Sequence, residues 1–157
     1  MRTFSTLEGL PVIDVGSGNE FGAVLDLICD EGRVSSIVID KRGWLNRHYL
    51  IPIEEIHSIG NDGIMVTDLQ KLHHYTDAEK HRLHLKHGKH QFRGKLLLST
   101  EGEKLGLVED VYFNEELGTI TGYEVTDGLL SDLIEGRKVI RGGGKLVVGK
   151  EKAILSI

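Results

Sequence analysis

The sequence predicts an all-β protein in which two small β-barrels follow one another, joined by a partly helical, basic linker. Three observations lead to this fold class: glycine is abundant, short apolar runs alternate with turn residues, and the chain repeats itself. Of the 157 residues, 20 are glycine and only two are proline. Glycines spread along a chain supply the turns and bulges that a β-rich fold requires. Short strands between such turns favour small barrels.

The repeat relates residues 7–40 to residues 92–127, with gaps of only one or two positions. The ends of the two copies agree as well, because 59–66 has the same pattern of apolar residues and glycine as 148–155. The chain therefore contains two copies of one unit of roughly 65–70 residues. Corresponding positions include Gly9 and Gly94, Gly22 and Gly106, Val24 and Val108, Asp26 and Asp110, and Ile39 and Val125.

The repeat sets the expected domain boundaries. We expect a first domain at residues 1–70, a linker at 71–90 and a second domain at 91–157. A unit of this size has a thin core and only marginal stability when it is alone. We therefore expect the two domains to pack against each other rather than to move as separate bodies.

Each copy is expected to form the same series of short strands. A turn at 31–33 separates the first two strands of the first copy, and a turn at 114–118 does so in the second, because strand-forming residues flank both segments. The expected strands are 21–28, 34–39 and 64–66 in the first copy, and 105–113, 119–125 and 153–156 in the second.

Two glycine-rich segments are similar to phosphate-binding loops but lack what such loops need. A dinucleotide-binding loop leads into a helix whose N-terminus holds the phosphate, whereas a strand is expected after 16–22. A P-loop spanning 141–145 would need glycine at position 139 and serine or threonine at 146, where the chain has Val139 and Leu146. We interpret the first segment as a hairpin turn and the second as a flexible loop, whose backbone amides could still contact an anion.

The sequence holds no recognisable catalytic signature, so we expect no enzyme, no catalytic residue and no cofactor. Asp26 and Asp110 are interpreted as structural residues that occupy the same outward-facing or turn-capping position in each barrel. Cys29, the only cysteine, lies in a predicted strand and is interpreted as a packed, unreactive thiol. A lone cysteine cannot form an intramolecular disulfide, which fits a reducing cytosol.

The N-terminal region has no apolar stretch long enough for a signal peptide. No window of the sequence approaches the roughly 20 apolar residues of a membrane-spanning helix. We therefore expect a soluble, cytoplasmic protein without a transmembrane segment.

The only tryptophan, Trp44, lies in the segment 41–49, where aromatic and basic residues alternate. This composition suits a protein hot spot or a nucleic-acid contact. In the alternative interpretation Trp44 and its neighbours plug the end of the barrel, as Leu129 and Leu130 would do at the comparable place in the second copy. Arg42, Trp44 and Arg47 are the binding candidates in this segment.

Six of the eight histidines fall within residues 73–90, and His81, His84, His87 and His90 recur at every third position. On a helix, residues three apart share a face, but each such step turns the row by about 60° around the axis. The four histidines would then not converge on one metal ion, and no metal site is expected. A histidine-rich arm for an acidic partner and a linker docked on the domains both stay open.

The segment 71–95, here called the basic strap, carries seven lysines or arginines and two acidic residues, although the whole chain has a net charge of −5. A strap with a net charge of +5 is expected to lie against the acidic remainder or to bind an acidic partner. Thr76 and Glu79 form a predicted capping box, and Gly88 is the predicted end of the helix. Protonation of the histidines below about pH 6 would raise the positive charge further.

The motifs of the two copies resemble those of the PRC-barrel family. The pattern F/L-G-x-V-x-D occurs at 21–26 and at 105–110, and I-x-S-I-G-x-D-x-I-x-V occurs at 56–66. An acidic or asparagine turn and a return strand follow the first pattern in both copies. The whole chain is similar to the tandem PRC-barrel proteins of Bacillus-type bacteria.

The resemblance implies binding rather than catalysis. Similar domains form the cytoplasmic part of the photosynthetic reaction-centre H subunit and the C-terminal half of a ribosome maturation factor. This chain lacks the membrane anchor of the first protein and the separate N-terminal barrel of the second, so neither role is carried over. The motifs are patterns of glycine and apolar residues, which specify a fold better than a function.

The sequence thus predicts a non-enzymatic protein-interaction or adaptor module with a protein partner that is not identified. The alternative is a ribosome- or RNA-assembly factor that uses the basic strap and Trp44, although a net charge of −5 argues against a general nucleic-acid binder. The surface is expected to include the loops 41–49 and 127–145. The candidate binding residues are Arg42, Trp44, Arg47, His81, His84, His87, Arg137 and Lys138.

Overall fold

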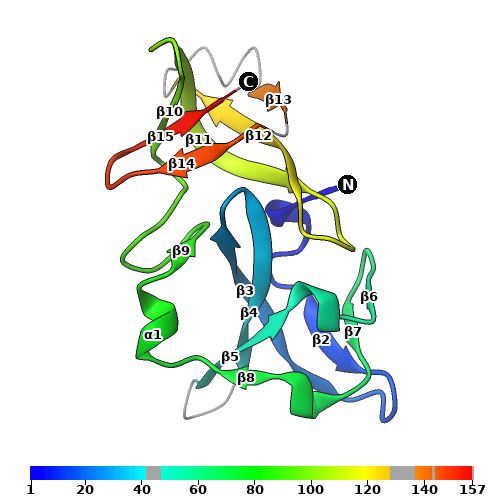
Figure 1. Cartoon of the computed structure of the whole chain (residues 1–157). Coiled ribbons are helices and arrows are strands. Elements are labelled where there is room, and N and C mark those ends of the chain that lie inside the picture. Colours follow the sequence, from blue (N-terminus) through cyan, green and yellow to red (C-terminus); the bar gives the residue numbers. More distant parts are fainter. Residues whose placement is uncertain (42–46, 128–136, 143, 157) are drawn as a thin grey trace.

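The computed structural model describes residues 1–41, 47–127, 137–142 and 144–156. Two mainly antiparallel sheets form the molecule, and they lie one above the other in Figure 1. The predicted all-β class is confirmed, and each copy of the repeat supplies most of one sheet. In the described part of the chain the two ends of each strand order do not pair, so the sheets are open where closed barrels were expected.

The first sheet has the strand order β6-β7-β2-β3-β4-β5-β8, and β9 pairs with β3 beside this path. Its strands are β2 (Pro11–Asp14), β3 (Glu20–Asp30), β4 (Arg33–Lys41), β5 (Arg47–Pro52), β6 (Ser58–Ile59), β7 (Ile64–Val66), β8 (His73–His74) and β9 (Leu83–His84).

The second sheet has the order β13-β12-β11-β10-β15-β14, and β1 pairs with β11 beside this path. Its strands are β1 (Arg2–Thr3), β10 (Leu96–Ser99), β11 (Lys104–Phe113), β12 (Ile120–Thr126), β13 (Lys138–Arg141), β14 (Leu146–Val148) and β15 (Lys152–Leu155). The helical elements are short, namely η1 (Phe4–Thr6), η2 (Ile53–Glu55), η3 (Leu69–Lys71) and α1 (Asp77–Lys80).

The pairing of strands repeats between the two copies. In the first sheet β2 is antiparallel to β3 and parallel to β7, and in the second β10 is antiparallel to β11 and parallel to β15. Gly22 and Gly106 hold the same place in this pattern. A Cβ at Gly22 would lie 2.4 Å from the carbonyl oxygen of Asp40, and one at Gly106 would lie 2.9 Å from Val125. Both glycines are therefore required by the close approach of the return strand.

The turn between β3 and β4 consists of Glu31 and Gly32, as the sequence predicts. Both residues have positive φ, at 47° and 78°. Two-residue hairpin turns of this kind match the right-handed twist of the flanking strands. The turn lets the long β3–β4 hairpin reach the second unit, where it contacts Gly118.

The two units are joined through backbone bonds and through one continuous core. The N–H of Val34 donates to the carbonyl of Gly118 at 2.7 Å, and the N–H of Ile120 donates to Gly32 at 3.0 Å. One hydrophobic cluster contains buried residues of both units, among them Leu27 and Phe113. The expected packing of the two units against each other is confirmed.

A reciprocal exchange of strands links the units further. The first strand of the chain, β1, pairs with β11 of the second sheet, while β9, which precedes the second unit, pairs with β3 of the first sheet. Figure 1 shows both short strands at the level where the two sheets meet. Each unit thus sends its leading segment to the long strand of the other.

The helix in the basic strap is much shorter than predicted. The capping box of Thr76 and Glu79 is present, but α1 ends at Lys80 after four residues. Beyond it the chain becomes extended, because Leu83 and His84 pair with β3 and Leu85 is buried in the core. Gly88 has a φ of 92° but does not end a helix. The prediction of a helix that continues to Gly88 was wrong.

Candidate functional site

Aromatic and basic side chains gather at one end of the first sheet, on β3, β4, β5 and β8. The ring centroids of Phe21 and Tyr49 lie 5.0 Å apart, edge to face, and the ring of His74 lies 4.9 Å from that of Tyr49. The ammonium group of Lys41 stands 5.0 Å from the centroid of Phe21, at a distance that permits a cation–π contact. Arg47, paired with Lys41 across β4 and β5, is exposed.

These five residues, Phe21, Lys41, Arg47, Tyr49 and His74, are here called the aromatic–basic face. The strand register places four of them together, because Tyr49 is the cross-strand partner of His74 and Lys41 is that of Arg47. Phe21 joins them through its ring contact with Tyr49. Cross-strand partners point to the same side of a sheet. The face also flanks both ends of the segment 42–46, which carries Arg42 and Trp44. Those two candidates lie outside the described residues.

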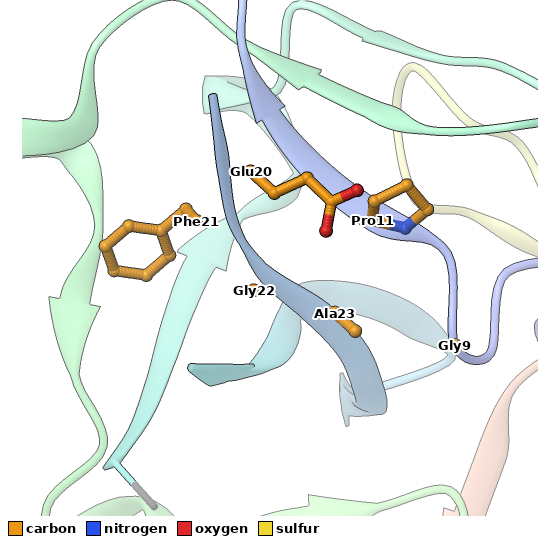
Figure 2. A pocket seen from close by; sticks show the side chains of 6 residues that line it. All are labelled: Gly9, Pro11, Glu20, Phe21, Gly22 and Ala23. Carbon is orange, nitrogen blue, oxygen red and sulfur yellow. The ribbon is translucent and has the colours of Figure 1, made fainter. Parts of the chain in front are cut away.

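A shallow hollow of about 350 Å³ lies beside this face (Figure 2). Its lining residues are Gly9, Pro11, Glu20, Phe21, Gly22 and Ala23. Figure 2 shows Glu20 directed towards Pro11 on one side of β3, while Phe21 points to the other side. Glu20 is the one charged residue among the described residues of the lining, and its charge would repel phosphate. The strand β3 begins at Glu20, inside the glycine-rich segment 16–22, and is antiparallel to β2, as predicted for a hairpin turn.

The basic strap lies on the two sheets and most of its positive charge is paired. Six of its seven cations have partners among the described residues, and four of these partners are carboxylates outside the strap. The contacts join Lys71 to Glu55 at 2.9 Å, Lys80 to Asp77 at 2.9 Å, Arg82 to Asp30, Lys86 to Glu8 at 2.6 Å, Arg93 to Glu109 at 3.2 Å, and Lys95 to the carbonyl of Lys150.

His84, one of the candidate binding residues, is buried within the fold. Its side chain is only 2% exposed. Nδ1 donates to the carbonyl of Arg82 at 2.8 Å, and Nε2 shares a hydrogen bond with the hydroxyl of Tyr75, also at 2.8 Å. Gly88 packs on the ring, since a Cβ there would lie 3.3 Å from Nδ1. Both ring nitrogens are thus occupied within the fold.

The other predicted site residues do not form one site. His81 is exposed at the C-terminal end of α1, and His87 is exposed beyond β9. Arg137 donates to Glu124 at 2.8 Å on the second sheet, and Lys138 is exposed at the start of β13. The aromatic–basic face lies on the first sheet, at the other end of the molecule in Figure 1. Arg47 is the described candidate that belongs to this face.

Two buried carboxylates hold the exchanged segments. Asp26, 1% exposed, accepts the N–H groups of Lys86 at 3.0 Å and His87 at 2.7 Å, both from the strap. Burial raises the pKa of Asp26, and these backbone hydrogen bonds partly oppose the rise. Asp110, 5% exposed, accepts the N–H groups of Phe4 and Ser5 from the N-terminal segment. The predicted structural role is confirmed, but the expected outward-facing or turn-capping position was wrong.

Cys29 shows no features of a catalytic thiol. It is 2% exposed within the core, and burial, followed by the nearby Asp26, raises its pKa to about 12. A nucleophilic cysteine needs the opposite, a lowered pKa and access to solvent. The interpretation as a packed thiol is confirmed, and its lack of reactivity stays a prediction. Among the described residues, no three His, Cys, Asp or Glu side chains are close enough to hold a metal ion.

Sequence reasoning missed Phe21, Lys41, Tyr49 and His74 as members of one surface. The signal for Tyr49 was present in the segment 41–49, but His74 was assigned to a linker and not to a strand of the first sheet. Only the pairing of β8 with β5 brings His74 beside Tyr49.

None of the helices in the described part of the chain has the length and hydropathy needed to cross a bilayer.

Comparisons with known proteins agree with the repeat. The sequence model of the PRC-barrel domain family matches twice, at residues 1–73 and 86–154. A similar protein is YrrD of Bacillus subtilis (strain 168), which is described as uncharacterized. It is 30% identical over 161 residues, and the similarity covers 99% of this chain and 88% of YrrD.

Proposed function

Because the chain belongs to the PRC-barrel family, with one domain in each half, we propose that it is a non-enzymatic protein-interaction module. The two domains act as one rigid platform that presents the aromatic–basic face to a protein partner. The observation that carries the proposal is the cluster of Phe21, Tyr49 and His74 with Lys41 and Arg47 at its border.

The composition of this face is that of a binding surface. Aromatic residues and arginine are enriched among residues that dominate protein–protein binding energies. Phe21, Tyr49 and Lys41 are already held by mutual packing, so little side-chain entropy remains to be lost when a partner binds. In the sequence, Arg42 and Trp44 stand between Lys41 and Arg47, two residues of the face. A partner with a complementary acidic and apolar patch would fit this composition.

The rest of the molecule supports a non-enzymatic role. The buried aspartates and the buried histidine that the structure describes, Asp26, Asp110 and His84, are engaged in hydrogen bonds that hold the chain together. The one thiol, Cys29, is buried with a raised pKa. We also propose a cytoplasmic location, because a single free cysteine is typical of a reducing compartment.

Charge reversal on the face tests this proposal. Tagged wild-type protein, the Lys41→Glu/Arg47→Glu variant and the control Lys104→Glu are used to capture proteins from a nuclease-treated extract of the native cells. Lys104 is an exposed strand residue of the second sheet. Its replacement by glutamate also reverses a lysine charge, but away from the aromatic–basic face. We expect a protein set that is retained by the control and lost by the double variant. Equal capture by all three proteins would reject the face as the interface.

An RNA-assembly role is the second candidate, favoured by the basic and aromatic composition of the same face. The strap contributes little to it, because Arg82, Lys86 and Arg93 are paired with carboxylates of the chain. Binding of RNA through phosphate contacts has a steep dependence on salt concentration. A tight, steeply salt-dependent affinity for ribosomal RNA, lost in Lys41→Glu/Arg47→Glu, would favour this candidate over the protein-interaction module.

A further inference from the structure

The last hairpin of the chain, β14–β15, exposes an apolar pair. Val147 and Ile154 are directly opposite each other across the two strands, and they are 52% and 42% exposed. Their neighbours Leu146, Ala153 and Leu155 are buried, so the hairpin is apolar on both sides. Covering this pair with a partner would remove apolar area from water, which favours binding.

Lysines border this pair at both ends. Lys145 directly precedes β14 and lines one hollow together with Val147. Lys152 is on the same side of β15 as Ile154, because side chains alternate along a strand. A further lysine, Lys150, lies in the turn between the strands. The residues 145–152 thus contain three lysines and one glutamate in a chain of net charge −5.

Val147 stands between two hollows in the surface. One has a volume of about 480 Å³ and lies over the turn, where Lys150, Lys152 and Ile154 line it with Val147. The other has a volume of about 740 Å³ and lies between the two units, where Arg33 and Ile120 line it with Val147 and Lys145. A ligand that follows β14 would therefore find space on both sides of the apolar pair.

The outer edge of β14 is available for pairing in the described structure. Its hydrogen-bonded neighbour there is β15 alone, and β14 ends the strand order of the second sheet. Extended peptides bind to such edges by adding a strand, with backbone hydrogen bonds giving affinity and alternate side chains giving specificity. Lysines along an edge oppose the pairing of two identical edges, which disfavours a second copy of this chain as the occupant.

We propose that β14 binds an extended acidic segment of a partner protein as an added strand. The segment carries an apolar residue opposite Val147 and acidic residues two positions before and after it. The apolar side chain packs on Val147 and Ile154, and the carboxylates face Lys145 on one side and Lys150 or Lys152 on the other. This surface is separate from the aromatic–basic face, so the module has two binding sites of different chemistry.

A defined peptide tests the proposal by NMR. The probe is a blocked nine-residue peptide with the central sequence Glu-Thr-Ile-Thr-Glu, and the control peptide has Lys-Thr-Ile-Thr-Lys. We expect saturable shifts of the amide signals of β14 with the acidic peptide only. Lys145→Glu/Lys152→Glu and Val147→Thr/Ile154→Thr should each weaken binding at least tenfold. The Lys41→Glu/Arg47→Glu variant should bind the peptide like wild type, which separates this site from the proposed function.

Each variant changes exposed side chains, so its melting temperature and circular dichroism spectrum should match those of wild type. Equal shifts with the basic peptide, or no shift at β14 at millimolar acidic peptide, would overturn the proposal. Sedimentation supplies a second test. A concentration-dependent dimer that Val147→Thr/Ile154→Thr dissolves would show that a second copy occupies the edge, and would also overturn it.

Discussion

Asp26 and Asp110 are equivalent buried carboxylates, and each binds the leading segment of the opposite unit. Asp110 accepts the N–H groups of Phe4 at 2.9 Å and Ser5 at 3.0 Å, as Asp26 does for Lys86 and His87. Each also accepts the N–H of the residue that follows it, at 2.8 Å. The two aspartates therefore stabilise the strand exchange that makes the tandem units one body.

Replacing either aspartate should destabilise the whole protein. In Asp110→Asn, one carboxylate oxygen becomes an NH₂ group that cannot accept the N–H of Ser5 or its neighbours. Leaving a buried donor without an acceptor costs about 1–3 kcal/mol, and we expect this loss in the free energy of unfolding in urea. Asp62→Asn, at an exposed position, is the control and should stay within about 0.5 kcal/mol of wild type. Equal stability of both variants would contradict the role of Asp110.

The raised pKa of Asp26 predicts a specific dependence of stability on pH. Its ordinary value is 3.8 and the folded value is higher, so between the two the folded state binds more protons than the unfolded state. The contribution of Asp26 to the free energy of unfolding therefore falls as pH rises through this window, and is constant above it. We expect the difference between wild type and Asp26→Asn to fall over the same range.

Urea titrations of both proteins from pH 3.5 to 7 measure this difference. Carboxylates with lowered pKa, such as Asp77 and Glu79, contribute stability that rises with pH. They are present in both proteins, so their effect cancels in the comparison. A difference that is independent of pH, or that rises with pH above 4, would show that the pKa of Asp26 is not raised.

Gly118 should be the glycine most sensitive to substitution at the contact between the units. Its φ is 78°, and a Cβ would lie 2.1 Å from the carbonyl oxygen of Val34. Gly102 has a φ of 83° but has nothing within 4 Å of the Cβ position. Gly102→Ala should therefore cost about 1 kcal/mol for the backbone conformation alone, whereas Gly118→Ala should cost about 3 kcal/mol or more. Similar melting temperatures for the two variants would contradict this packing.

Cys29 should be unreactive in the folded protein. Its pKa of about 12 leaves almost no thiolate at neutral pH, and its burial excludes reagents. We expect a thiol-specific disulfide reagent to modify it only as fast as the protein opens, and at once in urea. Fast modification in native conditions would show that Cys29 is accessible and reactive, and would contradict its interpretation as a buried, non-catalytic thiol.

The sequence predicts the parts of the fold that depend on local pattern. The equivalence of Gly22 and Gly106 follows from the repeat. In the structure, both glycines lie where the return strand comes too close to leave room for a side chain. The capping box at Thr76 and Glu79 is likewise a local signal, and it is present. These features need only neighbouring residues, or a comparison of the two copies, to be recognised.

The parts that depend on contacts between distant residues could not be predicted in this way. Pairing of β9 with β3 ends the helix at Lys80 and buries His84. No local pattern shows that the backbone of a segment with a histidine at every third position will be extended. The same is true of His74, which reaches Tyr49 only through β8. The segment 41–49 is the part of the candidate site that the sequence predicts. Phe21 and His74, the other residues of the aromatic–basic face, were identified only from the fold.

The measurement that tests the proposed function most directly is capture of native proteins by the tagged chain, from one extract that is divided into a nuclease-treated and an untreated half. A protein-interaction module predicts that the same protein set is captured in both halves, and that Trp44→Ala reduces it. If the captured set consists of ribosomal proteins and disappears after nuclease treatment, the chain is bound to RNA and the proposed function is contradicted.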